Sequence, residues 1–273
     1  DTIQKPEGLK LWLMAARAYS FPASIIPVLL GSVLAVLLNP GLQFNFINFT
    51  LTLIGCILVQ VGTNIINDIF DYDKGIDKED KELGIPHGGS MVISMGFLTI
   101  KQMKTAAFVS LLISFLIGVY LFTQSGMWIL YLSIFGLLSA IFYTAKPIAL
   151  KYKALGDIQV ILSFGVGMTL GSYIVQTGEF SILPVIFSIP LGLLIDAILH
   201  SNNIRDINFD GKFGVKTLPI LIGEKLSVKF YYVLILGAYL SVLLFVALKM
   251  LPWFALLSFI TLPLALKLVK MSE

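Results

Sequence analysis

The sequence predicts an all-α protein, a polytopic transmembrane helical bundle of eight or nine spans. Two observations support this prediction. Hydrophobic residues make up 57% of the 273 residues and charged residues only 13%, whereas soluble domains carry about 25% charged residues. The charges are also clustered, because none lies between Arg17 and Asp68 or between Lys104 and Lys146. Each gap is long enough for two membrane-crossing helices of about 20 residues and a short turn.

The spans follow from the apolar segments in chain order. An amphipathic lead-in at 6–17, which carries Lys10 and Arg17 beside leucines and Trp12, is expected to lie in the membrane interface. The whole chain, 1–273, is expected to form a single membrane-embedded domain. The eight predicted spans are 19–38, 48–70, 102–122, 126–145, 155–177, 181–203, 229–248 and 250–270.

The loops predict how the spans are oriented. If the N-terminus is cytoplasmic, 18 of the 19 Lys and Arg residues fall on the cytoplasmic side or at its edge, and Lys249 is the exception. Such a bias follows the positive-inside rule. We therefore expect a multi-pass protein of the cell membrane, plasma or inner, whose larger loops face the cytoplasm.

Composition also excludes some classes of function. The net charge of +3 is small and no basic segment is interleaved with aromatic residues, so nucleic acid is not an expected partner. Cys56 is the only cysteine, which excludes an internal disulfide. The lipid bilayer is the expected surrounding, and the pattern assigns no oligomeric state.

The first polar cluster closes the second span and reads NIINDIFDYDKGID over 64–77. Residues four apart share a helix face, as Asn67 and Asp71 do. Asn64 and Asp68 form a second pair of this kind. This spacing predicts amide and carboxylate side chains side by side at the cytoplasmic end of the helix.

Gly75 is expected to end that helix, which leaves Asp77 beyond it. The second cluster, NNIRDINFDGKFGVKTL over 202–218, closes the sixth span on the same membrane side. Three of its residues are predicted to form a stripe along one helix face at strict four-residue spacing: Asn202, Asp206 and Asp210.

Carboxylates at a helix C-terminus repel each other and face the negative end of the helix dipole. A cation compensates for this arrangement, and Mg²⁺ prefers oxygen ligands that it shares with substrate phosphates. The two clusters are therefore predicted to converge and to hold Mg²⁺ and the diphosphate of a lipid substrate. The expected metal ligands are Asn67, Asp71, Asp77, Asn202, Asp206 and Asp210.

Other side chains are assigned around this centre. Asp68 is either a further ligand or a proton acceptor, and Arg17 is counted as substrate-binding. The alternative, that both clusters are only solvated loops, is less favoured because their asparagines lie inside the ends of apolar helices. Cations in loops on the same side are expected to neutralise phosphate charge: Lys146, Lys151, Lys153, Arg205, Lys212 and Lys216.

Two ionisable residues lie within the sixth span. Intramembrane ionisable residues are candidates for function, so Asp196 either lines the deep cavity and binds substrate or forms a structural pair with His200, four residues on. Asp157 is expected to cap a helix N-terminus. His87 is expected to belong to a loop or to help place an acceptor.

These motifs resemble the UbiA superfamily of intramembrane prenyltransferases, whose signature is two NxxxDxxxD-like motifs at the ends of the second and sixth spans. The second motif is complete here, whereas the first has Gly75 at its third position and an aspartate two residues later. The resemblance covers most of 17–225. Further segments that resemble the family are FPASIIPVLLG (21–31), GGSMVISMGFLT (88–99), YTAKPIALKYKALGD (143–157), SYIVQTG (172–178) and GKFGVKTLPILIGE (211–224).

The resemblance implies an enzyme that uses Mg²⁺ to transfer a polyprenyl group from polyprenyl diphosphate to an aromatic acceptor. The departure at Gly75 resembles the branch that prenylates 1,4-dihydroxy-2-naphthoate on the way to menaquinone. Tyr143 and Lys146 resemble family positions near the reacting cation and the diphosphate, which makes Tyr143 a catalytic candidate. The resemblance also implies nine helices around a central cavity open to the bilayer. Because the pattern holds eight, a final span is either missing from this sequence or too short to be visible in it.

Two other functions remain open at this point. A different acceptor within the superfamily, such as hydroxybenzoate, a chlorophyll precursor or a glycerol phosphate lipid, fits the same motifs. An ion-coupled transporter would use the acidic residues as cation sites. Transporter sites usually lie near the membrane midplane at broken helices, whereas most acidic residues here are predicted at one face.

Overall fold

The computed structural model describes residues 5–76 and 89–270, and these contain helices without any β-strand. The predicted all-α class is therefore confirmed. The chain divides into two compact units. Unit 1 comprises Asp1–Leu150 and Gly167–Ser181, and unit 2 comprises Lys151–Val166 and Ile182–Glu273.

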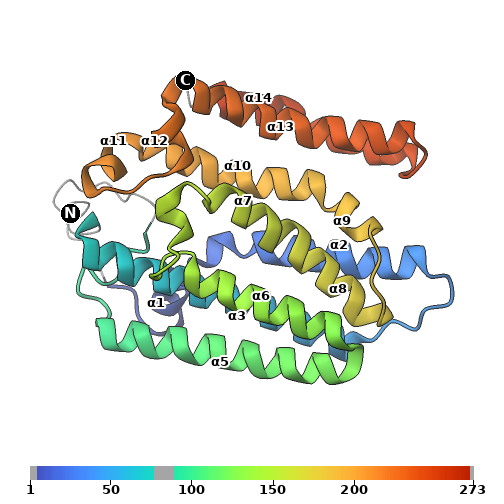
Figure 1. Cartoon of the computed structure of the whole chain (residues 1–273), viewed down its shortest axis with the longest axis horizontal. Helices are drawn as coiled ribbons and strands as arrows, with labels where there is room; N and C mark the ends of the chain where they lie inside the picture. Colours follow the sequence, from blue (N-terminus) through green and yellow to red (C-terminus); the bar gives the residue numbers. More distant parts are fainter. Residues whose placement is uncertain (1–4, 77–88, 271–273) are drawn as a thin grey trace. The chain divides into compact units, whose positions relative to one another are not determined.

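Unit 1 is built from helices that pack in pairs. α3 packs along α5, α2 packs along α8, and α5 also contacts α6 (Figure 1). A short 3-10 turn, Ala18–Ser20, leads into α2. The helices are α1 (Gly8–Ala15), α2 (Pro22–Leu38), α3 (Phe46–Lys74), α5 (Ile100–Ser125), α6 (Met127–Phe142) and α8 (Met168–Thr177).

Unit 2 centres on α10, which packs against α13, α7 and α12. Between α7 and α8 the chain forms a π-helical segment, Ile161–Gly167, that passes from unit 2 into unit 1. The remaining 3-10 turns of this part are Leu150–Lys153, Gly211–Phe213 and Trp253–Thr261. The helices are α7 (Gly156–Val160), α9 (Leu183–Phe187), α10 (Ile189–Arg205), α11 (Ile207–Asp210), α12 (Leu218–Ile222), α13 (Glu224–Ala247) and α14 (Leu262–Lys270).

Every predicted span is largely helical, but not every one is a single long helix. Among the described residues, six helical stretches are long and apolar enough to cross a membrane, and Met127–Phe142 is a shorter apolar helix. The predicted span 181–203 is divided into α9 and α10 at Ser188. The six long stretches are Ala18–Leu38, Phe46–Lys74, Ile100–Ser125, Gly156–Thr177, Glu224–Ala247 and Trp253–Lys270.

Local sequence signals explain where several helices begin and end. The Thr99 side chain accepts a hydrogen bond from the Gln102 backbone N–H, and the Gln102 side chain accepts one from the Thr99 N–H, which forms a capping box at α5. Gly75 follows α3 in the left-handed conformation, at φ 89°. The predicted end of the second span at Gly75 is therefore confirmed, because glycine adopts this conformation without steric cost.

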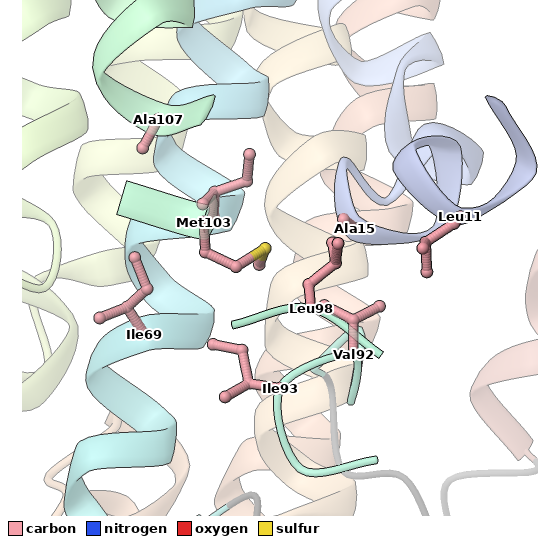
Figure 2. Close-up of a cluster of buried hydrophobic side chains, with 9 residues drawn as sticks. Leu11, Ala15, Ile69, Val92, Ile93, Leu98, Met103 and Ala107 are labelled. Carbon is pink, nitrogen blue, oxygen red and sulfur yellow. The ribbon is translucent and has the colours of Figure 1, made fainter. Parts of the chain in front are cut away.

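Apolar side chains fill the interior of each unit. In unit 1, residues of α1, α3 and α5 and of the segment 91–98 pack together, among them Leu11, Ile69, Val92 and Met103 (Figure 2). In unit 2, residues of α10 and α13 pack with Val269 of α14. Within a membrane, such side chains hold helices together mainly through close van der Waals packing.

Small residues allow α2 and α8 to approach closely. A Cβ atom built on Gly31 would lie 2.1 Å from the backbone oxygen of Thr169, so no larger residue fits there without moving a helix. Ser32 and Ser172 exchange a hydrogen bond of 2.7 Å across the same contact. Small residues with polar side chains are typical of helix contacts in membranes.

Candidate functional site

The first motif lies in the last turns of α3, in unit 1. Asn67 and Asp71 are both buried, and the Asn67 side-chain amide donates a hydrogen bond of 3.0 Å to Oδ2 of Asp71. The predicted i, i+4 pairing is therefore present. The pair therefore places one amide and one carboxylate side by side on one face of α3.

The second pair of this cluster, Asn64 and Asp68, contacts another segment of the protein. Gln60, Asn64 and Asp68 follow at four-residue spacing on α3 and contact the segment that joins α1 to α2. Gln60 Nε2 donates to the Ser20 carbonyl oxygen (2.9 Å). Asn64 Nδ2 donates to the Ala16 carbonyl oxygen (3.0 Å). We refer to Gln60, Asn64 and Asp68 as the α3 polar stripe.

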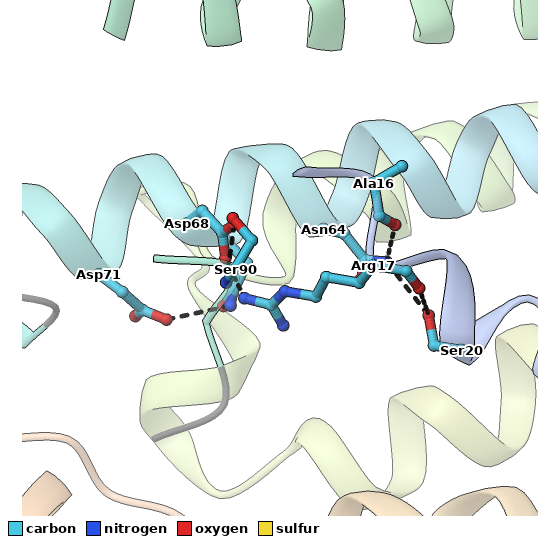
Figure 3. A network of polar contacts seen from close by, with 8 residues as sticks. Ala16, Arg17, Ser20, Asn64, Asp68, Asp71 and Ser90 are labelled. Carbon is cyan, nitrogen blue, oxygen red and sulfur yellow. Dashed lines mark hydrogen bonds and ion pairs between the residues drawn. The ribbon is translucent and has the colours of Figure 1, made fainter. Parts of the chain in front are cut away.

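Asp68 ends this stripe in a buried ion pair with Arg17. The Asp68 side chain is 1% exposed and that of Arg17 is 13% exposed. Figure 3 shows the Arg17 side chain extending along α3 toward Asp68, where Ser90 also donates its backbone N–H (3.2 Å) and its hydroxyl. The carboxylate of Asp68 is thus committed to protein partners.

The ion pair keeps the guanidinium of Arg17 protonated. Burial by itself lowers the pKa of its guanidinium, but the negative charge of Asp68, with a further contribution from Asp71, raises the pKa above its ordinary value. The backbone of Arg17 is left-handed, at φ 55°, a conformation that costs about 1–2 kcal/mol for a residue with a Cβ. The fold therefore retains a strained turn that brings a permanent cation close to the first motif.

The second motif lies in unit 2, where α10 ends at Arg205. The prediction of one continuous helix stripe is wrong, because Asp206 breaks the helix at φ −95°, ψ 5° and α11 follows as a separate short helix. The backbone N–H of Asp206 still donates to the carbonyl oxygen of Asn202 (3.1 Å), and that of Asp210 donates to the carbonyl oxygen of Asp206 (2.8 Å). These two backbone hydrogen bonds keep Asn202, Asp206 and Asp210 on successive turns of the chain despite the break in the helix.

Asp206 is also engaged by its neighbour. Arg205 donates from Nε to Oδ1 (2.7 Å) and from Nη2 to Oδ2 (2.8 Å), a bidentate contact. Asp206 and Asp210 are buried, whereas Asn202 is exposed. Bidentate Arg–carboxylate contacts are among the stronger hydrogen bonds in proteins, so any ligand at Asp206 competes with Arg205.

The remaining predicted cations are spread over both units. Lys146 lies exposed after α6 in unit 1, where Tyr143 is half-buried at the helix end. Lys153 and Lys212 lie exposed on short 3-10 turns of unit 2. Asp77 and His87 lie outside the described residues.

Of the two roles that the sequence left open for Asp196, the structural pair with His200 is not present. His200 does not pair with Asp196, because its Nδ1 contacts Asp157 Oδ1 (2.8 Å) and its Nε2 contacts the Ser227 carbonyl oxygen (3.1 Å). The helix-cap prediction for Asp157 is also wrong, since Leu155 occupies the cap position of α7 and Asp157 lies in the first turn. Asp196 is wholly buried.

The donor chemistry of both motifs fits Mg²⁺. Carboxylate and amide oxygens are its preferred protein ligands, and a site of one or two carboxylates per metal is usual when phosphate completes the shell. Within the part of the chain that the structure describes, no three His, Cys, Asp or Glu side chains group into a protein-only metal site.

Comparisons with known proteins agree with this architecture. The chain matches the UbiA prenyltransferase family over residues 24–271. It is 36% identical over 266 residues to a UbiA prenyltransferase domain-containing protein 1 homolog of Drosophila melanogaster, covering 96% of this chain and 71% of that protein. It is 34% identical over 219 residues to 1,4-dihydroxy-2-naphthoate octaprenyltransferase of Bacillus subtilis, covering 80% and 67%.

The fold itself has relatives among solved structures. A UbiA homolog from Archaeoglobus fulgidus bound to DMAPP and Mg²⁺ matches with a TM-score of 0.67 at 16% identity, covering 95% of this chain and 86% of that one. The apolar helices of this chain and its family match define it as a multi-pass α-helical membrane protein, and each unit carries one Asn/Asp motif. The chain belongs to the UbiA prenyltransferase family, as the sequence motifs predicted, and is therefore a prenyltransferase.

Proposed function

We propose that this prenyltransferase transfers a polyprenyl group from polyprenyl diphosphate to 1,4-dihydroxy-2-naphthoate, in a Mg²⁺-dependent step toward menaquinone. The observation that carries the metal and diphosphate chemistry is the buried Asn67–Asp71 pair at the end of α3. The acceptor is proposed from the Bacillus subtilis relative that is named for it.

The metal would be held by oxygen ligands of both motifs. When bound, Mg²⁺ neutralises the charge that gathers on the departing diphosphate. Arg205 would then leave Asp206 and turn its guanidinium toward a phosphate oxygen, because a ligand at Asp206 displaces its bidentate contact. The proposed ligands are Asn67, Asp71, Asp77, Asn202, Asp206 and Asp210.

The reaction needs the C1–oxygen bond of the prenyl group to break, with its electron pair leaving on the diphosphate. The ring carbon that bears the carboxyl group forms the new bond to C1. Loss of CO₂ then returns an electron pair to the ring and restores its aromaticity. Tyr143 is proposed to face the developing allylic cation, and Arg17, Lys146, Lys153 and Lys212 are proposed to bind diphosphate oxygens.

Asp68 is proposed to position Arg17. Its carboxylate already accepts hydrogen bonds from Arg17 and Ser90, so a metal ion or a substrate proton would have to displace them. This assignment replaces the two roles that the sequence left open for Asp68, a metal ligand or a proton acceptor.

The orientation in the membrane is proposed from the charges. The Lys and Arg residues gather in the loops that contain both motifs, which supports the proposal that those loops face the cytoplasm from a plasma or inner membrane. Membership of a prenyltransferase family gives no support to the alternative of an ion-coupled transporter. A different acceptor is a closer alternative, since the relative from Drosophila melanogaster is as similar and its name specifies none.

The test is product analysis with purified protein in lipid nanodiscs. The protein is given Mg²⁺, a polyprenyl diphosphate, and in separate reactions 1,4-dihydroxy-2-naphthoate, 4-hydroxybenzoate and a glycerol phosphate lipid. We expect mass spectrometry to find a prenylated naphthalene that has lost its carboxyl group. Product from another acceptor alone would overturn the proposed substrate.

A variant tests the second motif. Asp206→Ala is expected to lower kcat by about 100-fold or more, the usual effect of removing a group that stabilises developing charge. Asp73→Ala is the matched control, since Asp73 is an exposed carboxylate near the end of α3 outside the motif. Near-normal turnover of Asp206→Ala would exclude Asp206 from the metal centre.

A further inference from the structure

Asp196 is a buried acid inside a predicted membrane span. It lies in the middle of α10 with 0% exposure, and neither of its carboxylate oxygens has a hydrogen-bond partner among the described residues. Buried polar groups in proteins are almost always paired, and an acid inside a membrane-spanning helix is costly unless something satisfies it. An unsatisfied acid at this position therefore indicates a partner other than the described side chains.

The neighbouring histidine cannot be that partner. His200 lies one turn further along α10, but both of its ring nitrogens are used by Asp157 and by the Ser227 carbonyl oxygen. A carbonyl oxygen only accepts, so Nε2 of His200 donates to Ser227 and the ring orientation is fixed between α7 and α13. Rotation of His200 toward Asp196 would break two buried hydrogen bonds.

The backbone around Asp196 is closely packed. Gly192, one turn before Asp196, lies against Gly165, where an added Cβ would come within 2.8 Å of the Gly192 Cα atom. Gly165 belongs to the π-helical segment Ile161–Gly167, and π-helical turns occur frequently at functional sites. The two backbones are thus in contact beside Asp196, on the same unit that carries the second motif.

Distance along α10 relates Asp196 to that motif. Ten residues separate it from Asp206, which corresponds to about 15 Å of helix rise. A diphosphate held at Asp206, its attached C1 and a bicyclic aromatic ring placed in line have a comparable length. The ring that reacts at C1 also carries both hydroxyl groups of 1,4-dihydroxy-2-naphthoate, and it would therefore lie between the levels of Asp206 and Asp196.

We propose that Asp196 accepts a hydrogen bond from a hydroxyl group of the aromatic acceptor. The proposal rests on the proposed function and names the residue that recognises the acceptor. The carboxyl oxygens of Asp196 can accept hydrogen bonds, and a phenolic hydroxyl supplies a donor on an otherwise apolar ring that can enter a membrane interior. The same contact draws the hydroxyl proton toward Asp196 and makes the ring a better nucleophile at carbon.

The experiment pairs changes in the protein with changes in the ligand. Wild type, Asp196→Asn and Asp196→Leu are compared in nanodiscs for binding of 1,4-dihydroxy-2-naphthoate and of 2-naphthoate, which lacks both hydroxyls, without any prenyl diphosphate. Wild type is expected to prefer the dihydroxy compound by about 10- to 100-fold, the range for a hydrogen bond to a charged group. Asp196→Leu is expected to abolish this preference, and Asp196→Asn to retain part of it.

Stability separates this role from a structural one. Because Asp196 has no hydrogen bond to lose among the described residues, Asp196→Leu is expected to keep or raise the thermal midpoint, as replacement of a functional buried acid commonly does. Ser188→Ala is the control, since Ser188 is equally buried at the start of α10 and donates to Val185 O (2.8 Å). A lowered midpoint in Asp196→Leu with the ligand preference intact would overturn the proposal.

Turnover completes the test. The KM for the acceptor is expected to rise in Asp196→Leu while the KM for the prenyl diphosphate stays unchanged. If wild type forms no prenylated naphthalene at all, the proposed function fails. If wild type is active and Asp196→Leu has an unchanged acceptor KM, the role of Asp196 fails and the proposed function stands.

Discussion

Disruption of the Arg17–Asp68 ion pair should destabilise unit 1 unequally, depending on which partner is removed. Removing one member of a buried pair costs about 3–5 kcal/mol, because the other charge stays buried without compensation. Asp68→Ala also removes two hydrogen bonds from Ser90, each worth about 1 kcal/mol. Arg17→Ala leaves those two bonds in place. We therefore expect Asp68→Ala at the upper end of the range and Arg17→Ala at the lower end.

The measurement is a double-mutant cycle on the free energy of unfolding, by detergent titration of the purified protein followed by tryptophan fluorescence. The double variant should lose less than the sum of the single losses, with a coupling of up to about 3 kcal/mol. Asp73→Ala, on the exposed side of α3, should change stability by no more than about 0.5 kcal/mol. Additive, small losses would refute the reasoning. Full stability with lost turnover in Asp68→Ala would return Asp68 to the metal centre.

Three further predictions follow from contacts in each unit and from the proposed metal. Gly31→Ala should destabilise the protein by about 1–3 kcal/mol, because its Cβ overlaps the Thr169 carbonyl oxygen. Gly136→Ala, in open space on α6, is the control and should not lower the melting temperature. Equal melting temperatures for the two variants would contradict the packing argument. His200→Leu should cost about 3–5 kcal/mol because Asp157 is left buried and unpaired; an unchanged unfolding free energy would show that the pair is dispensable. Chelation of divalent metal should stop product formation and added Mg²⁺ should restore it, whereas turnover that persists after exhaustive chelation would contradict the metal assignment.

Much of the helical architecture could be predicted from the sequence because membrane spans leave a strong signal. Long charge-free gaps mark α2, α3, α5 and α6, and glycine and capping residues mark their ends. The division of the sixth span at Ser188 was not predicted, because the apolar pattern continues through it. Pro190 in the first turn of α10 was the signal that could have shown it. Asp206 likewise follows the four-residue spacing although the helix ends one residue earlier.

The side-chain partners were harder to predict because they join residues distant in sequence. Arg17 meets Asp68 across 51 positions, and His200 meets Asp157 across 43. Spacing within one helix indicated Asn67 with Asp71 correctly, but the same rule suggested Asp196 with His200, where a partner from another helix prevails. Gln60 could have been found, since it continues the Asn64–Asp68 spacing by one turn.

The α3 polar stripe has a consequence for how the chain enters the bilayer. Gln60 lies well inside an apolar helix, where an amide without hydrogen-bond partners is costly. Ser20 and Ser24 of the preceding helical segment satisfy it, so the two helices are more stable in lipid as a hairpin than either is alone. If the first helix entered the lipid before the second had emerged, these polar groups would lack their hydrogen-bond partners. The two helices are therefore expected to insert as one pair.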